Sequence, residues 1–364
     1  MRAMVLRGKN LTVEDVPRPA PGPGQVLAKI RACGICGSDL HAARYMDDMR
    51  QTAQNSRRNA WYDQRDYSGG IVMGHEFVAE VVEAGPGAES WTPGMRVTSM
   101  PILMAPDTPT GFLSIGYSPE VPGGYAEYIL MSSAFLLPVA DNVSDDVAAT
   151  TEPCAVGLHA VRESGIQPHQ SALVMGAGPI GLMTLLWLKQ TGVRYVAVSD
   201  YSAERRELAK LLGADDVFNP KEVDLAEELA HKLFIPAPGR EDKSYGGGPI
   251  TAAPDVVFEC VGVPGTLQQA MDLVQVRGAV TVVGVCMEPD RITPLLGINK
   301  QITMKFVLGY SAAEYAEALQ AFADGRVDTT PLVTRRVSLE ELPGAFQALA
   351  DPRDCKVLVV PGGA

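Results

Sequence analysis

The chain has 364 residues, of which 46% are hydrophobic and 20% charged, and its formal net charge is −12. A chain of this length exceeds the size at which a single core stops growing, so we expect two domains, or one domain interrupted by another. The acidic balance argues against nucleic acid and against an anionic membrane surface as partners, because both bind basic faces.

The six cysteines are spread along a long chain and do not form the dense disulfide framework of a small secreted protein. A reducing compartment, the cytoplasm, is therefore expected. The N-terminus reaches Lys9 without the apolar core of a signal peptide. The most apolar segment, 182–188, is far shorter than the roughly 20 residues of a membrane span, so no membrane partner is expected.

The first third of the chain has the pattern of short strands and loops. Its β-rich runs at 3–6, 26–31 and 78–84 are separated by stretches rich in proline and glycine. This pattern predicts an all-β body of the Greek-key type. The polar segment 42–70 is too long for a structureless loop, so we expect it to be partly helical or to be a working loop.

From Ser171 onward, strands and helices alternate, which predicts an α/β fold with a doubly wound parallel sheet. The region 236–249 is turn material, and the tail returns to two helices and a closing strand. The expected strands are 172–175, 195–199, 255–259, 279–283 and 356–360, and the expected helices are 180–189, 203–212, 267–274, 315–323 and 339–349.

A glycine-rich turn of the G-x-G-x-x-G form follows the first of these strands and opens a helix. Such a turn brings the backbone close to a pyrophosphate at the helix N-terminus. The residues expected to bind the cofactor there are Gly176, Gly178, Pro179, Ile180 and Gly181.

Asp200 lies at the end of the next strand, where a carboxylate would accept hydrogen bonds from the ribose hydroxyls and repel a 2′-phosphate. The pattern therefore favours NAD over NADP. Arg205 is a further cofactor candidate, since it and Arg206 could meet a 2′-phosphate, although their helix favours a solvated face. The alternative is that the glycines form only a tight turn and Asp200 only caps a helix.

Residues 32–41 pack two thiols, a hydroxyl, a carboxylate and an imidazole between glycines, which suggests part of a metal site. The residues that could join it are far apart in the chain. Taken singly, Cys36 reads as a buried thiol, His75 as a core imidazole and Glu152 as an acid at a helix N-terminus. Spacing alone does not connect these three residues.

Five ordered motifs together resemble the zinc-dependent medium-chain dehydrogenases, and they cover nearly the whole chain. The Glu-Pro pair is most similar to the branch of sorbitol and butanediol dehydrogenases. The motifs are Gly-Ile-Cys-Gly-Ser-Asp-Leu-His at 34–41, Gly-His-Glu-Phe-Val at 74–78, Pro-Gly-Gly-Tyr-Ala-Glu-Tyr at 122–128, Glu-Pro-Cys-Ala-Val-Gly at 152–157 and Gly-Ala-Gly-Pro-Ile-Gly at 176–181.

The resemblance implies a GroES-like catalytic domain, split into 1–150 and 298–364, around a Rossmann NAD-binding domain at 151–297. It also implies an enzyme that transfers a hydride reversibly between a secondary alcohol or polyol and NAD. The alternatives are a zinc-free, NADPH-dependent enone or quinone reductase of the same superfamily and a cofactor-binding homologue without catalysis.

The resemblance further implies one catalytic zinc ion held by Cys36, His75 and Glu152, with Cys154 as a rival third ligand. Asp39 and Glu76 match positions that orient or tune such ligands.

Zinc would lower the pKa of the substrate alcohol, and Ser38 would take its proton. That proton would leave by way of the cofactor ribose and His41. A merely solvent-exposed His41 remains the alternative.

The chain also departs from the family pattern. Many relatives bind a second, structural zinc through four close cysteines, whereas the segment 98–121 has none, so that zinc is expected to be absent. The segment 42–70, with Tyr45, Trp61, Tyr62 and Tyr67, is expected to be a lid or wall of the substrate pocket, or else a surface excursion or oligomer contact. In relatives, subunits pair at the strand 279–283 and the segment after it, so a homodimer or homotetramer is expected.

Overall fold

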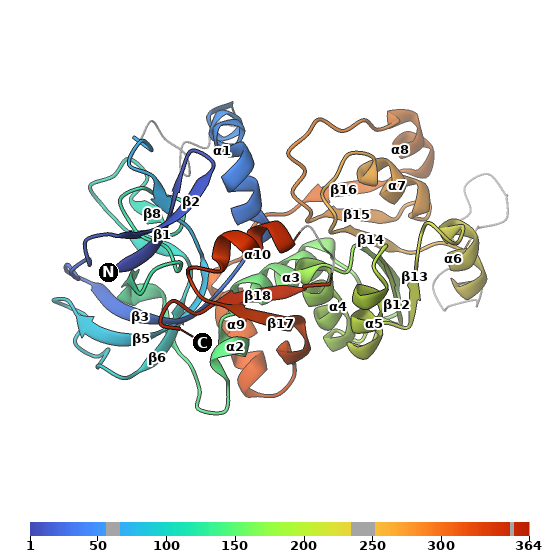
Figure 1. The fold of residues 1–364 in the computed structure, drawn as a ribbon. Helices are drawn as coiled ribbons and strands as arrows, with labels where there is room; N and C mark the ends of the chain where they lie inside the picture. The colour runs from blue at the N-terminus through green and yellow to red at the C-terminus, as the bar shows by residue number, and fades with distance from the viewer. Residues whose placement is uncertain (56–65, 234–251, 350–352, 364) are drawn as a thin grey trace. The chain divides into compact units, whose positions relative to one another are not determined.

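The computed structural model describes residues 1–55, 66–233, 252–349 and 353–363, and it separates into two compact units. Unit 1 comprises Met1–Glu152 and Tyr315–Ala364, and unit 2 comprises Pro153–Glu314 (Figure 1). We expected the second boundary at 297/298, but unit 2 continues to Glu314. The reason is a strand at 303–306 that sequence analysis did not predict and that extends the sheet of unit 2.

Unit 1 is built around a sheet with the strand order β10-β6-β5-β3-β18-β17, in which β9 also pairs with β3. Two smaller sheets, β2-β1-β4 and β7-β8, complete its β-rich body. The strands are β1 (Arg2–Arg7), β2 (Asn10–Asp15), β3 (Gln25–Gly34), β4 (Ile71–Val72), β5 (Glu76–Ala84), β6 (Arg96–Ser99), β7 (Ile102–Met104), β8 (Phe112–Ser114), β9 (Tyr128–Ser132), β10 (Leu136–Pro138), β17 (Val333–Val337) and β18 (Lys356–Val359).

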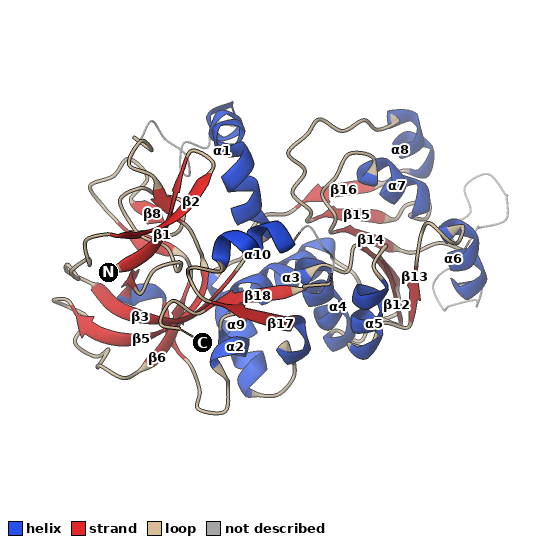
Figure 2. Cartoon of the chain, in the orientation of Figure 1, coloured by secondary structure: helices blue, strands red, loops and turns tan. Residues whose placement is uncertain are grey.

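Helices of unit 1 connect and flank these strands (Figure 2). Helix α1 has a kink at Tyr45, where the backbone leaves helical geometry. The boundaries between the units fall inside α3 and α9. The helices are α1 (Gly37–Asn55), α2 (Asp145–Ala148), α9 (Ala312–Ala323) and α10 (Leu342–Ala348), with short 3₁₀ turns at Ser133–Phe135 and Thr330–Leu332, and α3 (Thr151–Ser164) begins in unit 1 and continues into unit 2.

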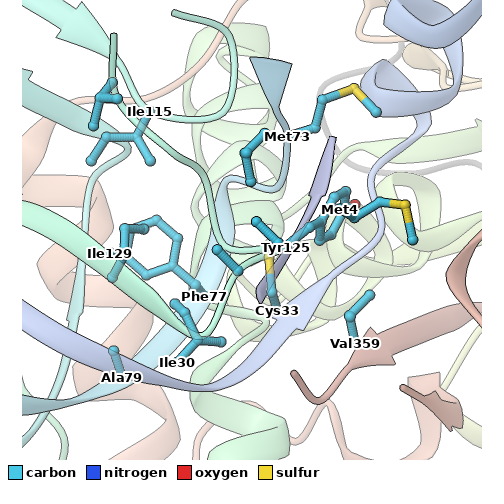
Figure 3. Packing of buried hydrophobic residues seen from close by; sticks show 14 of the residues in the cluster. Met4, Ile30, Cys33, Met73, Phe77, Ala79, Ile115, Tyr125, Ile129 and Val359 are labelled. Carbon is cyan, nitrogen blue, oxygen red and sulfur yellow. The ribbon is translucent and has the colours of Figure 1, made fainter. Parts of the chain in front are cut away.

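The hydrophobic core of unit 1 includes residues that lie in or beside the sequence motifs, and Figure 3 shows two of them, Tyr125 and Cys33. Gly74 has a φ of +95° and faces both side chains, so that a Cβ added there would lie 2.8 Å from Tyr125 and 2.9 Å from Cys33. Gly124 leaves the same space, since its Cβ would lie 2.5 Å from the Cys33 sulfur. Gly74 and Gly124 thus let two chain segments pack closely against Cys33, and Gly74 directly precedes His75.

Unit 2 is a parallel sheet with the strand order β13-β12-β11-β14-β15-β16, which confirms the predicted doubly wound α/β fold. All five residues of its central strand β11 are buried, as expected for a strand covered on both faces. The strands are β11 (Ser171–Met175), β12 (Tyr195–Ser199), β13 (Asp216–Phe218), β14 (Val256–Glu259), β15 (Ala279–Val282) and β16 (Thr303–Phe306), and the helices are α4 (Pro179–Gln190), α5 (Ala203–Leu211), α6 (Leu225–Leu233), α7 (Thr266–Leu273) and α8 (Pro294–Lys300).

Two segments singled out by sequence fall partly or wholly outside the described residues. Helix α1 occupies 42–55 of the segment expected to form a lid, whereas 56–65, with Trp61 and Tyr62, lie outside the description. The turn expected at 236–249 also lies outside it. The cysteine-free segment 98–121 contains the antiparallel pair β7 and β8. Among the described helices, none combines the length and apolarity that a bilayer crossing requires.

Candidate functional site

Strand pairing brings Cys36 and His75 together although 39 positions separate them. Strands β3 and β5 are antiparallel neighbours, and their register places Gly34 opposite Glu76. Cys36 follows the end of β3 by two residues, and His75 immediately precedes β5. Both side chains therefore emerge at the same end of the strand pair.

Among the described residues, the ligand atoms of Cys36, His75 and Glu76 lie within 4.8 Å of one another. His75 and Glu76 are buried and Cys36 is partly buried. Thiolate, imidazole and carboxylate are the donors that catalytic zinc sites use.

The orientation of His75 also fits a metal ligand. Its Nδ1 lies 3.3 Å from Oδ1 of Asp39, and its Nε2 lies 3.5 Å from the Ser38 hydroxyl. Metal-binding histidines commonly direct the second ring nitrogen toward a carboxylate. This arrangement leaves Nε2 available for a metal, so the residues present fit the zinc ion that the resemblance implies.

Without a metal, the surroundings of the cluster raise the pKa of both Cys36 and His75, whereas metal binding needs both side chains deprotonated. Burial raises the pKa of the Cys36 thiol, and the Glu76 charge raises it further. Burial lowers the pKa of His75, but the charge of Asp39 outweighs burial and raises it well above its usual range. Without a metal, the pair therefore holds protons that metal binding must release.

Glu76 forms a fully buried ion pair with Lys356 on β18, which runs beside β3. The Lys356 ammonium donates to both carboxylate oxygens, at 2.6 and 2.9 Å, and to the Ile35 carbonyl at 3.1 Å. Burial lowers the pKa of Lys356, but the negative charge of Glu76 outweighs burial and raises it. Lys356 was not predicted as a site residue. The sequence feature that could have indicated it is a single charged residue at the start of an apolar strand.

Asp39, on the first turn of α1, is completely buried beside His75. Its Oδ2 accepts hydrogen bonds from the Cys36 amide at 3.0 Å and from the Tyr125 hydroxyl at 2.6 Å. Burial raises the pKa of Asp39, but the charge of His75 and these donors outweigh burial and lower it. Asp39 thus lies where a carboxylate can fix the orientation of the His75 ring, and Tyr125 holds Asp39.

Glu152 lies in the first turn of α3 and is not one of the ligands that gather around Cys36. Burial raises the pKa of Tyr315, and the charges of both Glu152 and Glu76 raise it further. Glu76, which we expected to tune the ligands, thus lies within the cluster itself, and Glu152 as the third ligand stays a prediction.

Cys154, the rival third ligand, is completely buried. Its carbonyl accepts a hydrogen bond from the Trp187 indole at 2.9 Å. Burial raises the pKa of its thiol to about 12, because the thiolate would be desolvated. This environment is that of a packing residue.

The residues expected to carry the proton lie on the first two turns of α1. Ser38 contacts His75 and also accepts a hydrogen bond from the Tyr117 hydroxyl at 2.7 Å. His41 follows three residues later, on the same helix face, and is partly buried. Burial lowers the pKa of His41, and the Arg44 charge lowers it further.

In unit 2, the glycine-rich turn connects β11 to α4 with the expected geometry. Gly176 has a φ of +89°, Gly178 is the N-cap of α4, and Pro179 occupies the first helical turn together with Ile180. A Cβ on Gly181 would lie 1.9 Å from the Gly176 carbonyl oxygen, so only glycine allows this close return of the chain.

Asp200 connects this turn to the start of α5 through its two carboxylate oxygens. Oδ2 accepts a hydrogen bond from the Ala177 amide and Oδ1 from the Ser202 amide, each at 2.8 Å. The Arg206 guanidinium donates to the carbonyls of Asp200 and Tyr201, whereas Arg205 extends toward the turn, 3.9 Å from a Cβ placed on Gly178.

Two family models match the chain in the same two parts. Residues 22–141 match the alcohol dehydrogenase GroES-like domain, and residues 179–324 match the zinc-binding dehydrogenase domain.

Relatives match over almost their full length. The (R,R)-butanediol dehydrogenase of Bacillus subtilis is 31% identical over 363 residues, which cover 97% of each chain. The sorbitol dehydrogenase of Ovis aries is 30% identical over 371 residues, which cover 98% of this chain and 95% of the relative.

Solved structures agree with these matches. The crystal structure of 2R,3R-butanediol dehydrogenase from Bacillus subtilis has a TM-score of 0.79 and 29% identity, and it covers 99% of both chains. A zinc-binding dehydrogenase from Sinorhizobium meliloti 1021, bound to NADP, has a TM-score of 0.82 and 28% identity, also with 99% of both chains covered.

Proposed function

Because the chain belongs to the zinc-type medium-chain dehydrogenases, in the branch of the sorbitol and butanediol dehydrogenases, we propose that it oxidises a secondary alcohol or polyol with NAD. In this reaction, R₂CHOH and NAD⁺ give R₂C=O, NADH and H⁺. The hydride passes to the nicotinamide and the hydroxyl proton passes to the protein. The reverse reaction reduces the carbonyl compound.

The observation that carries this proposal is the cluster of Cys36, His75 and Glu76 beside the Ser38 hydroxyl. A bound zinc ion would supply a Lewis acid that lowers the pKa of the substrate hydroxyl. We assign Cys36 and His75 as its ligands, together with a carboxylate. Glu76 is the candidate inside the cluster, and Glu152 is the candidate that the motif resemblance implies.

Ser38 is the residue that we propose takes the substrate proton, since its oxygen lies next to His75. His41 would release the proton to solvent, because it lies one helical turn away and is only partly buried. The lowered pKa of His41 favours this release, because an imidazole with a low pKa holds its proton weakly.

The preference for NAD rests on Asp200. A carboxylate at the end of β12 disfavours a 2′-phosphate, and Asp200 is also held in place by the turn that it supports. An Asp200→Ser variant should raise the efficiency with NADP relative to NAD. Equal use of both cofactors by the wild type would contradict this part of the proposal.

We also propose that the chain forms a homodimer or homotetramer in which subunits pair through the edge of the unit 2 sheet. Strand β16 pairs with β15 on one side only among the described residues, and Phe306 at its end and Leu308 just after it are 67% and 71% exposed. An open edge carrying apolar side chains is suited to pairing with a second copy.

The expected compartment is the cytoplasm. None of the six cysteines, all of which lie in the described part of the chain, forms a disulfide, which suits a reducing environment.

The experiment that tests the function is a screen of linear, cyclic and aromatic secondary alcohols and polyols with NAD and NADP, combined with metal analysis. We expect NAD-linked oxidation that a chelator abolishes and zinc restores. Full activity at less than about 0.3 zinc per chain would instead support the zinc-free reductase. No turnover of any alcohol despite bound zinc and NAD would support a homologue without catalysis.

A further inference from the structure

We propose that Tyr117 is a positioning residue for the proton transfer. Its phenol holds the Ser38 hydroxyl in one orientation, so that the serine oxygen receives the substrate proton through a single remaining lone pair. This inference rests on the proposed function, and in particular on the role of Ser38.

The backbone fixes Tyr117 firmly. Tyr117 follows β8 in a tight turn, in which the amides of Tyr117 and Ser118 both donate to the Ser114 carbonyl, at 3.1 and 2.9 Å. The Ser118 hydroxyl accepts a hydrogen bond from the Ser114 amide at 3.0 Å. Both the carbonyl and the amide of Ser114 therefore form hydrogen bonds within the turn.

The same turn is packed against the residue before His75. Gly116 has a φ of +87°, and a Cβ placed on it would lie 2.9 Å from the Gly74 carbonyl oxygen. Only glycine allows this approach, and it places Tyr117 beside His75, with ring centroids 5.3 Å apart. The Tyr117 side chain is only 7% exposed, so its position is set by packing.

The hydrogen-bond geometry assigns the role of the phenol. The Tyr117 hydroxyl donates to Oγ of Ser38 at 2.7 Å, whereas the distance from Oγ to Nε2 of His75 is 3.5 Å. A serine hydroxyl has one proton and two lone pairs. The phenol occupies one lone pair, which leaves the other lone pair to accept a proton while the serine's own proton departs.

The proton count balances without any change on the phenol. Ser38 gains the proton of the substrate hydroxyl and passes its own on toward His41, which releases it to solvent, and Tyr117 donates the same hydrogen bond before and after. The residue therefore acts through Ser38. A phenylalanine at position 117 would keep the ring that packs on His75 and would remove the hydroxyl that donates to Ser38.

The test is the Tyr117→Phe variant of the zinc- and NAD-loaded enzyme, assayed with the best secondary alcohol of the screen. A net hydrogen bond of this kind corresponds to a loss of roughly two- to tenfold in kcat. We expect that loss with KM, zinc content and NADH affinity unchanged, and with a larger solvent deuterium isotope effect on kcat. The matched control is Tyr128→Phe, whose ring lies under Arg18 in the same unit and which should behave as wild type.

A double-variant cycle with Ser38→Ala separates positioning from packing. If Tyr117 acts through Ser38, Tyr117→Phe causes no further loss in the Ser38→Ala background. An equal loss in both backgrounds, an unchanged kcat in the single variant, or a loss of zinc from it would overturn the inference. A wild type without zinc or dehydrogenase activity would instead refute the proposed function, so the two failures are distinguishable.

Discussion

The buried pair of Lys356 and Glu76 allows a quantitative prediction for the Lys356→Met variant. Methionine keeps an unbranched side chain and removes the ammonium. Glu76 and Lys356 are 0% and 1% exposed, so the carboxylate would remain buried without a counter-charge. Removing one partner of a buried pair costs about 3–5 kcal/mol.

That cost should be visible in thermal unfolding. For a unit of this size, 1 kcal/mol corresponds to roughly 2–4 °C, so the Tm of unit 1 should fall by roughly 6–20 °C. Because Glu76 also faces Cys36 and His75, the measurement is made on chelator-treated protein, where loss of a metal cannot contribute. Adding Glu76→Gln to Lys356→Met should recover most of the loss, since no unpaired charge remains.

The control is Lys210→Met on α5. Lys210 pairs with Glu207 at 2.9 Å, but both side chains are exposed, so we expect a loss of at most about 0.5 kcal/mol. The reasoning is refuted if Lys356→Met costs no more than Lys210→Met. It is also refuted if the double variant loses the sum of the two single losses.

Three further predictions concern single positions. Tyr125→Phe removes the 2.6 Å hydrogen bond to Asp39, so zinc affinity should fall roughly 10–100-fold in a competition titration; unchanged affinity would mean that Asp39 needs no such support. Cys154 should resist alkylation at pH 8 in the folded protein, because its pKa is raised to about 12, and Cys154→Ser should retain zinc and turnover; loss of zinc would restore Cys154 as a ligand. Gly181→Ala should weaken NADH binding measured by fluorescence, because its Cβ would overlap the Gly176 carbonyl, while zinc content stays unchanged; wild-type NADH affinity would contradict the assigned turn.

The regular elements of unit 2 were predictable because local pattern determines them. Residues 172–175 and 195–199 are continuous apolar runs, and glycine punctuation marks the turn into α4. The strand β16 was missed for the converse reason. Its sequence, Thr-Met-Lys-Phe, has no apolar run because it lies at the edge of the sheet, and three of its four residues are exposed.

The metal cluster could be predicted only in part. Motif resemblance identified Cys36 and His75, but the inclusion of Glu76 follows from the register of β3 and β5, which no local pattern encodes. The contribution of Lys356 depends on a strand 280 positions away in sequence. Tyr117 lies in a turn that packs against Gly74 because Gly116 has no side chain. No local sequence pattern indicates this contact between the two segments.

The central claim is that Cys36 and His75 hold a catalytic zinc ion. The most direct test is the zinc content and turnover of Cys36→Ala, with NADH binding measured in the same preparation. The account predicts about one zinc per chain in the wild type. In the variant, it predicts lost zinc and lost turnover, with NADH binding retained because the cofactor turn lies in unit 2. A Cys36→Ala protein that keeps both its zinc and its turnover would contradict the account.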